Sequence, residues 1–141
     1  MVTINIETSP SFPNFKIISV KGSMDAVSCK DIDNKVIPLI EQEKTDIVLD
    51  ISAVDYLSST GIMSLVKYLV FLTDKKRILR LVKPPEAVNH TLRVVGLDKH
   101  FDMYDNVDEA LRKERTSPTG ISEKHPLLKG MAELLRKQKS S

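Results

Sequence analysis

The sequence has little of what catalytic and metal-binding domains rely on. Its 141 residues include one cysteine, three histidines and no tryptophan. Cys29 stands alone and cannot form a disulfide within the chain, which favours a reducing compartment. His90, His100 and His125 lack the spacing of metal ligands. No glycine-rich phosphate loop, dinucleotide-binding motif or nucleophile elbow occurs. The sequence therefore argues against an enzyme and implies no cofactor.

Long hydrophobic runs are also absent. The longest apolar stretch, residues 62–72, is interrupted by Ser64 and Lys67 and is far shorter than the roughly 20 residues that span a bilayer. The chain opens without a basic segment followed by an apolar core, so we expect no signal peptide. With 41% hydrophobic and 28% charged residues, the composition is that of one soluble globular domain. We expect it in the cytoplasm.

The charge is low but unevenly distributed. The formal net charge is +2. Residues 1–115 hold 16 Lys and Arg against 17 Asp and Glu, a net of −1, whereas residues 116–141 hold five against two, a net of +3. The body therefore lacks the charge of a nucleic-acid-binding domain, and the basic character belongs to the tail. We expect a domain at 1–115 and a linker with a helical tail at 116–141.

Hydrophobic periodicity predicts an α/β body. After an opening hairpin, strands and helices alternate, which is typical of a mostly parallel sheet. The strands are predicted at residues 3–7, 15–20, 46–51, 77–82 and 101–104. Helices are predicted at 25–43 and 59–73, followed by one that Gly96 ends and one that Asn106 caps. Pro38 lies inside the first helix, where we expect a kink or a break.

The tail contains a second amphipathic pattern. Residues 116–122 have the composition of a linker, and residues 124–139 predict a basic helix of about four turns. Its apolar stripe consists of Leu127, Leu128, Met131, Leu134 and Leu135. Three interpretations remain open: the helix packs on its own domain or is partly disordered, it docks to a partner or a second copy, or it contacts a membrane surface.

The candidate site is the start of the helix predicted at 59–73, where Ser58, Ser59, Thr60 and Gly61 follow one another. The first amides of a helix have no intrahelical partners, so one serine can cap them while the glycine permits close packing. The alternative is a phosphorylation switch. A phosphoserine adds about 1.5–2 negative charges, which a helix N-terminus tolerates. In that interpretation Gly61 lets a partner approach the backbone.

Three segments together resemble bacterial anti-sigma factor antagonists, the STAS-domain family. Residues 46–51 and 56–62 are similar to its signature, a hydrophobic strand followed by Asp-Ser-Ser-Gly-Leu at a helix start. Residues 22–25, Gly-Ser-Met-Asp, resemble its Gly-x-Leu-Asp turn, and residues 95–101 its late Gly-Leu segment. The resemblance covers about residues 2–113. It implies a mixed sheet of four or five strands flanked by about four helices.

The resemblance also implies a function without catalysis. In partner switching, the unmodified domain binds an anti-sigma factor that is a serine kinase, which frees the sigma factor. The kinase then phosphorylates the domain and releases it, and a phosphatase resets it. By position Ser59 matches the phosphoacceptor, with Thr60 and Gly61 after it. Ser58 stands where many members have Asp.

Asp25 matches the acid of the family's loop near the switch serine, although a helix N-cap is an equal interpretation. A STAS module that binds another protein or a small ligand without phosphorylation remains the alternative function. A small enzyme using Asp25 and Ser59 is disfavoured because no His or Lys base is near in sequence. Whether the chain forms a homodimer is left open.

Overall fold

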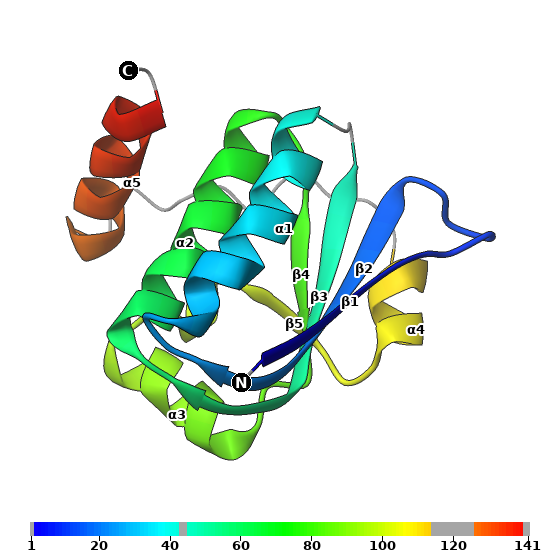
Figure 1. Ribbon diagram of the computed structural model, residues 1–141, viewed down its shortest axis with the longest axis horizontal. Helices are drawn as coiled ribbons and strands as arrows, with labels where there is room; N and C mark the ends of the chain where they lie inside the picture. The colour runs from blue at the N-terminus through cyan, green and yellow to red at the C-terminus, as the bar shows by residue number, and fades with distance from the viewer. Residues whose placement is uncertain (1, 43–44, 114–125, 140–141) are drawn as a thin grey trace.

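The computed structural model describes residues 2–42, 45–113 and 126–139, and in them a five-stranded sheet flanked by helices (Figure 1). The strand order is β1-β2-β3-β4-β5, with β1 antiparallel to β2 and all other neighbours parallel. The strands are β1 (Val2–Thr8), β2 (Phe15–Met24), β3 (Asp46–Leu57), β4 (Leu79–Val82) and β5 (Asp102–Tyr104). The helices are α1 (Ser28–Gln42), α2 (Ser59–Asp74), α3 (Glu86–Val94), η1 (Asp98–His100, a 3-10 helix), α4 (Val107–Arg112) and α5 (Pro126–Lys139). The α/β prediction, with an opening hairpin and a mostly parallel sheet, is confirmed.

The two faces of the sheet are covered by different helices (Figure 1). In β3, Ile47 and Leu49 join the large core beneath α1, α2 and α3, while Val48 joins a smaller core beneath α4. This alternation follows from the period of two along a strand. The strand predicted at 46–51 is therefore buried on both faces. Arg80 of β4 is buried in the smaller core and donates a hydrogen bond to the carbonyl of Ala110, which ties α4 to the sheet.

Strand β3 is longer than predicted. The prediction ended it at residue 51, but it continues to Leu57, paired with the end of β2, and buries Val54 and Leu57. Of the kink or break expected at Pro38, the break does not occur, since helix α1 runs through this residue. Pro38 is exposed, so water can reach the carbonyl that loses its partner, while Val36 and Ile40 on either side of it are buried in the core.

Helix α5 packs on α2 rather than standing apart. Ala132 and Leu135 are buried, and the Arg136 guanidinium meets the Asp74 carboxylate at the end of α2, with Nη2 to Oδ1 at 2.9 Å. Leu134, part of the predicted stripe, is 53% exposed. The described residues thus favour packing on the chain's own domain. The side chains of Leu127, Leu128 and Met131, the linker at 116–122 and the boundary at 115 lie outside the described residues.

Candidate functional site

The candidate site lies where the carboxyl ends of β2 and β3 meet. Met24, the last residue of β2, is paired with Leu57, the last residue of β3. The segment 23–28 leads from one strand into α1, and the segment 55–61 leads from the other into α2. Parallel strands commonly present their functional groups at this edge of a sheet. We call the exposed surface of these two segments the α2-start surface.

Ser58 is the N-cap of α2 and also links it to β2. Its Oγ accepts a hydrogen bond from the Gly61 amide at 3.1 Å and donates one to the Met24 carbonyl at 2.9 Å. Its own amide donates to the same carbonyl at 3.0 Å. An ionised Asp at this position could accept from the amide but could not donate to the carbonyl. Serine therefore performs the capping role and adds a second contact.

Gly61 is the point of closest approach between α2 and the end of β2. A Cβ at this position would lie 2.5 Å from the Met24 carbonyl oxygen and 2.7 Å from the Leu57 side chain. Gly61 is buried, so these contacts cannot be relieved toward solvent. The close-packing interpretation therefore explains Gly61. Because Gly61 is buried, the surface that a partner could contact is formed by other residues.

Asp25 caps the neighbouring helix, α1. Its Oδ1 accepts from the amides of Val27 at 3.0 Å and Ser28 at 2.9 Å, and its own amide donates to the Ser28 hydroxyl at 3.0 Å. This reciprocal arrangement is a capping box. The hydrogen bond from the Ser28 amide is the main reason that the pKa of the Asp25 carboxyl lies below its ordinary value. The two caps are brought together because Met24, the residue before Asp25, accepts from Ser58.

Ser59 and Thr60 are exposed in the first turn of α2. Among the described residues, no hydrogen-bond partner is seen for the Ser59 hydroxyl, and the first turn of α2 carries no acidic side chain. Two large apolar side chains on the same two segments are also exposed, Val27 by 79% and Tyr56 by 58%. Sequence reasoning missed both, since the strand predicted at 46–51 ended before Tyr56 and assigned it no face of the sheet. Exposed apolar groups beside free hydroxyls suit a protein contact.

A polar clamp holds the two helices of the site together. Asp33 of α1 accepts hydrogen bonds from the Lys67 ammonium at 2.7 Å and from the Tyr68 hydroxyl, both on α2. Burial is the main cause that raises the pKa of Tyr68, so this hydroxyl remains a donor. The clamp fixes α1 and α2 relative to each other, and with them the two capped helix starts.

Within the described residues, no group of three His, Cys, Asp or Glu side chains could hold a metal ion. The helices of that part of the chain are all too short or too polar to cross a membrane. The polar groups of the site are hydroxyls, backbone amides and the carboxylates of Asp25 and Asp55. The chemistry that such groups support is phosphoryl acceptance and protein contact.

A family model described as the STAS domain matches residues 3–110. The chain belongs to the STAS-domain family. The match includes both segments of the candidate site and ends before α5, so the basic tail lies outside it.

Several curated relatives and solved structures are similar to this chain. The anti-sigma-F factor antagonist RsfB of Mycobacterium tuberculosis is 24% identical over 98 residues, which cover 67% of this chain and 77% of RsfB. A crystal structure of an anti-sigma factor antagonist from Mycobacterium paratuberculosis has 24% identity and a TM-score of 0.69, covering 80% of this chain and 96% of that one. Bacillus SpoIIAA in its phosphorylated form has 16% identity and a TM-score of 0.62, covering 77% and 96%. These structural likenesses confirm the expected STAS fold.

Proposed function

We propose that this STAS domain is a non-catalytic anti-sigma factor antagonist that works by partner switching. Its α2-start surface binds an anti-sigma factor serine kinase in the cytoplasm, and phosphorylation of Ser59 releases it until a phosphatase removes the phosphate. The observation that carries the proposal is the exposed Ser59 hydroxyl, one residue after the cap of α2. The relatives named as anti-sigma factor antagonists support the choice of partner.

The physical argument for release concerns a large negative charge added to the contact. Unmodified, the surface offers the hydroxyls of Ser59 and Thr60 and the apolar side chains of Val27 and Tyr56. A phosphate on Ser59 adds about 1.5–2 negative charges, which a partner would have to desolvate on binding. Asp25 and Asp55 already give this surface negative charge, and the phosphate adds to it. Binding is therefore lost because the partner would have to desolvate a strongly negative surface.

The fold itself should tolerate the phosphate. The N-terminus of α2 carries the positive end of the helix dipole, and no acidic side chain of its first turn neutralises it. The Ser58 cap bonds to the Gly61 amide and does not use the Ser59 hydroxyl. Modification would thus change the surface while leaving the helix intact, which is what a reversible switch requires.

Three consecutive residues carry hydroxyls here, Ser58, Ser59 and Thr60, and we call them the hydroxyl triplet. Their surroundings favour Ser59 as the acceptor. Ser58 is half-buried, and its hydroxyl is engaged with both Gly61 and Met24. A kinase would have to break the cap to reach it. Thr60 is exposed and becomes part of the contact surface, with Asp25 and the cap residue Ser58 beside it.

The test is phosphorylation by the serine kinase that this chain binds. Incubation with the kinase and ATP should add one phosphate, mapped by mass spectrometry to Ser59. Ser59→Ala should abolish the addition, while the matched variant Ser52→Ala, at an exposed serine of β3, should not. No phosphate on the wild-type chain, or equal phosphate on Ser59→Ala, would contradict the switch.

The second candidate is a STAS module that binds another protein or a small ligand without phosphorylation. The observation favouring it is Ser58, which replaces the acid found in many members. If recovery of binding partners from the native host yields no kinase and the phosphorylation test is negative, this second function replaces the first.

A further inference from the structure

Strand β3 carries an extra residue shortly before the start of α2. Gly22 of β2 is paired with Val54, and the next residue of β2, Ser23, is paired with Tyr56. In this register Asp55 is the extra residue, and two residues of β3 therefore lie opposite one residue of β2. Such a β-bulge often occurs beside a functional site, where it re-aims a side chain. This one lies within the α2-start surface.

The bulge decides which side chains at the end of β3 face outward. Successive residues of a regular strand point to opposite faces. Here Asp55 and Tyr56 are both exposed, while Val54 before them and Leu57 after them are buried. Strict alternation from Val54 would instead turn Tyr56 toward the core and Leu57 toward solvent. The extra residue thus leaves 58% of Tyr56 exposed and keeps Leu57 in the core.

Both strands are specialised at this point. The Ser23 hydroxyl donates a hydrogen bond to Asp55 Oδ1 at 2.8 Å, which joins the extra residue to the opposite strand. Gly22, directly before Ser23, has a φ of 114°, a conformation that a residue with a Cβ rarely adopts. The backbone that presents Tyr56 is therefore fixed from both strands.

We propose that Tyr56 anchors the serine kinase of the proposed switch, and that Ser23 and Asp55 are its positioning residues. This role rests on the proposed function and adds to it a residue outside the hydroxyl triplet that sets the affinity. A few buried aromatic residues commonly carry most of the binding energy of an interface. A tyrosine ring supplies a large contact area and loses little side-chain entropy on binding. The kinase accordingly receives the ring in an apolar depression.

Tyr56 is better suited to this role than Val27, the other large exposed apolar residue of the surface. Val27 lies in the turn before α1, and its smaller side chain offers less contact area. Tyr56 lies in a strand that is paired with β2. It also precedes Ser59 by three residues, so the two lie within about 11 Å of each other. A partner that covers the Tyr56 ring can therefore reach the Ser59 hydroxyl.

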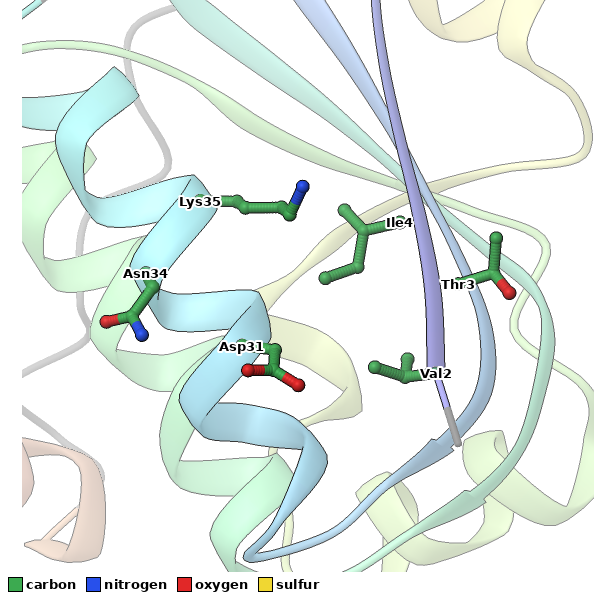
Figure 2. Close-up of a pocket in the computed structure, with 6 residues that line it drawn as sticks. All are labelled: Val2, Thr3, Ile4, Asp31, Asn34 and Lys35. Carbon is green, nitrogen blue, oxygen red and sulfur yellow. The ribbon is translucent and has the colours of Figure 1, made fainter.

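The groove between β1 and α1 provides a control surface (Figure 2). Its volume is about 410 Å³, and Figure 2 shows Val2 and Ile4 pointing from the strand toward the helix. The described residues that line it include none from the segments 23–28 and 55–61. Asn34 lines the groove from α1 and is exposed and uncharged. Asn34→Ala therefore truncates a side chain outside the α2-start surface without changing the charge of the chain.

The test is the kinetics of Ser59 phosphorylation by the purified kinase, with the full chain as the varied substrate. Tyr56→Ala should raise KM at least tenfold and leave kcat within about twofold, because the ring contributes binding that does not change during phosphoryl transfer. Tyr56→Phe, which keeps the ring, should stay within about threefold of the wild-type KM, and Asn34→Ala within about twofold. The urea midpoint of Tyr56→Ala should equal that of the wild type, since the side chain is exposed.

Rescue separates position from charge in the pair of Ser23 and Asp55. Asp55→Ala removes the acceptor and should raise KM about fivefold, whereas Asp55→Asn keeps an oxygen that accepts from Ser23 and should restore the wild-type KM. Ser23→Ala should match Asp55→Ala. Equal KM values for Asp55→Asn and Asp55→Ala would assign the effect to charge and overturn the positioning role.

The anchor and the switch fail in different ways. A wild-type KM for Tyr56→Ala, in a chain that still receives phosphate at Ser59, would overturn the anchor and leave the proposed function standing. No phosphate on the wild-type chain would overturn both. An equal rise of KM in Asn34→Ala would spread the contact over a wider area and refute a single anchor.

Discussion

The two helices that begin at the site, α1 and α2, are capped by different chemistry. Asp25 caps α1 with a carboxylate, and Asp31 adds a second acid to its first turn. Ser58 caps α2 with a neutral hydroxyl, and the first turn that follows has no acid. Carboxylates therefore already neutralise the positive end of the α1 helix dipole, whereas no acidic side chain neutralises the positive end of the α2 dipole. This difference explains how a phosphate on Ser59 could be accommodated by one helix start beside another that is already neutralised.

The largest expected effect comes from placing a permanent charge at the start of α2. Ser59→Asp should weaken binding of the kinase at least 100-fold, or about 2.7 kcal/mol, because a buried and unpaired carboxylate opposes the contact. Isothermal titration with the purified kinase measures this. Ser52→Asp, which adds the same charge on β3 away from the helix start, should bind within threefold of the wild type. Equal loss in both variants would mean that net charge, not position, decides binding.

Gly61→Ala tests the close contact that seats α2 on β2. The added methyl group would lie 2.5 Å from the Met24 carbonyl oxygen, so the helix start must shift. We expect a loss of about 2–3 kcal/mol in the free energy of unfolding, measured by urea denaturation. In α5, Gly130→Ala meets nothing within 4 Å and should instead stabilise the chain, by up to about 1 kcal/mol. A neutral Gly61→Ala would refute the seating role of this glycine.

The stability that the Ser58 cap provides can be measured separately from the effect of an acidic charge at the same position. Ser58→Ala removes the bond to the Gly61 amide and should cost about 1 kcal/mol of unfolding free energy, read from thermal and urea denaturation. Ser58→Asp restores the acid common in the family and should recover most of this stability, since a carboxylate also accepts from the amide. If Ser58→Asp is as unstable as Ser58→Ala, the donated bond to the Met24 carbonyl is the more important contact.

The smallest effect distinguishes the two caps by pH. The pKa of Asp25 is lowered from its ordinary value of 3.8 by the amide bond from Ser28, so its capping contribution is present above that value. It is lost as the pH falls through the lower, folded-state pKa. Asn caps without titrating, so Asp25→Asn should flatten the stability profile below about pH 4. Ser58→Ala should keep the wild-type slope in that range. Identical slopes in the Asp25→Asn variant and the wild type would show that the cap does not titrate.

Much of the fold could be predicted because its signals are local. The stripe from Ile62 to Thr73 and the apolar run at Ile47–Leu49 depend only on residue spacing, and both elements formed as predicted. The later part of β3 could not be predicted, since its burial arises from pairing with β2, which is distant in sequence. In α5, the predicted apolar stripe placed Leu134 facing inward, but Leu134 is exposed. The small Ala132 faces α2 instead, because it allows close helix contact.

The candidate site was located by sequence, but its geometry was not. The hydroxyl triplet and Asp25 were identified from spacing and resemblance. The Met24 carbonyl, which joins the cap of α2 to the end of β2, is a backbone group and leaves no sequence pattern. Tyr56 and Val27 are also ordinary residues in the sequence, and only the ends of β2 and β3 expose them together.

The most direct test of the switch compares the affinity of the kinase for the wild-type chain before and after stoichiometric phosphorylation at Ser59. Titration calorimetry of the two forms, with phosphatase treatment to recover the first, gives both values on one protein. The partner-switching account predicts at least a 100-fold loss on phosphorylation and full recovery after phosphatase. Equal affinities of the two forms would contradict it.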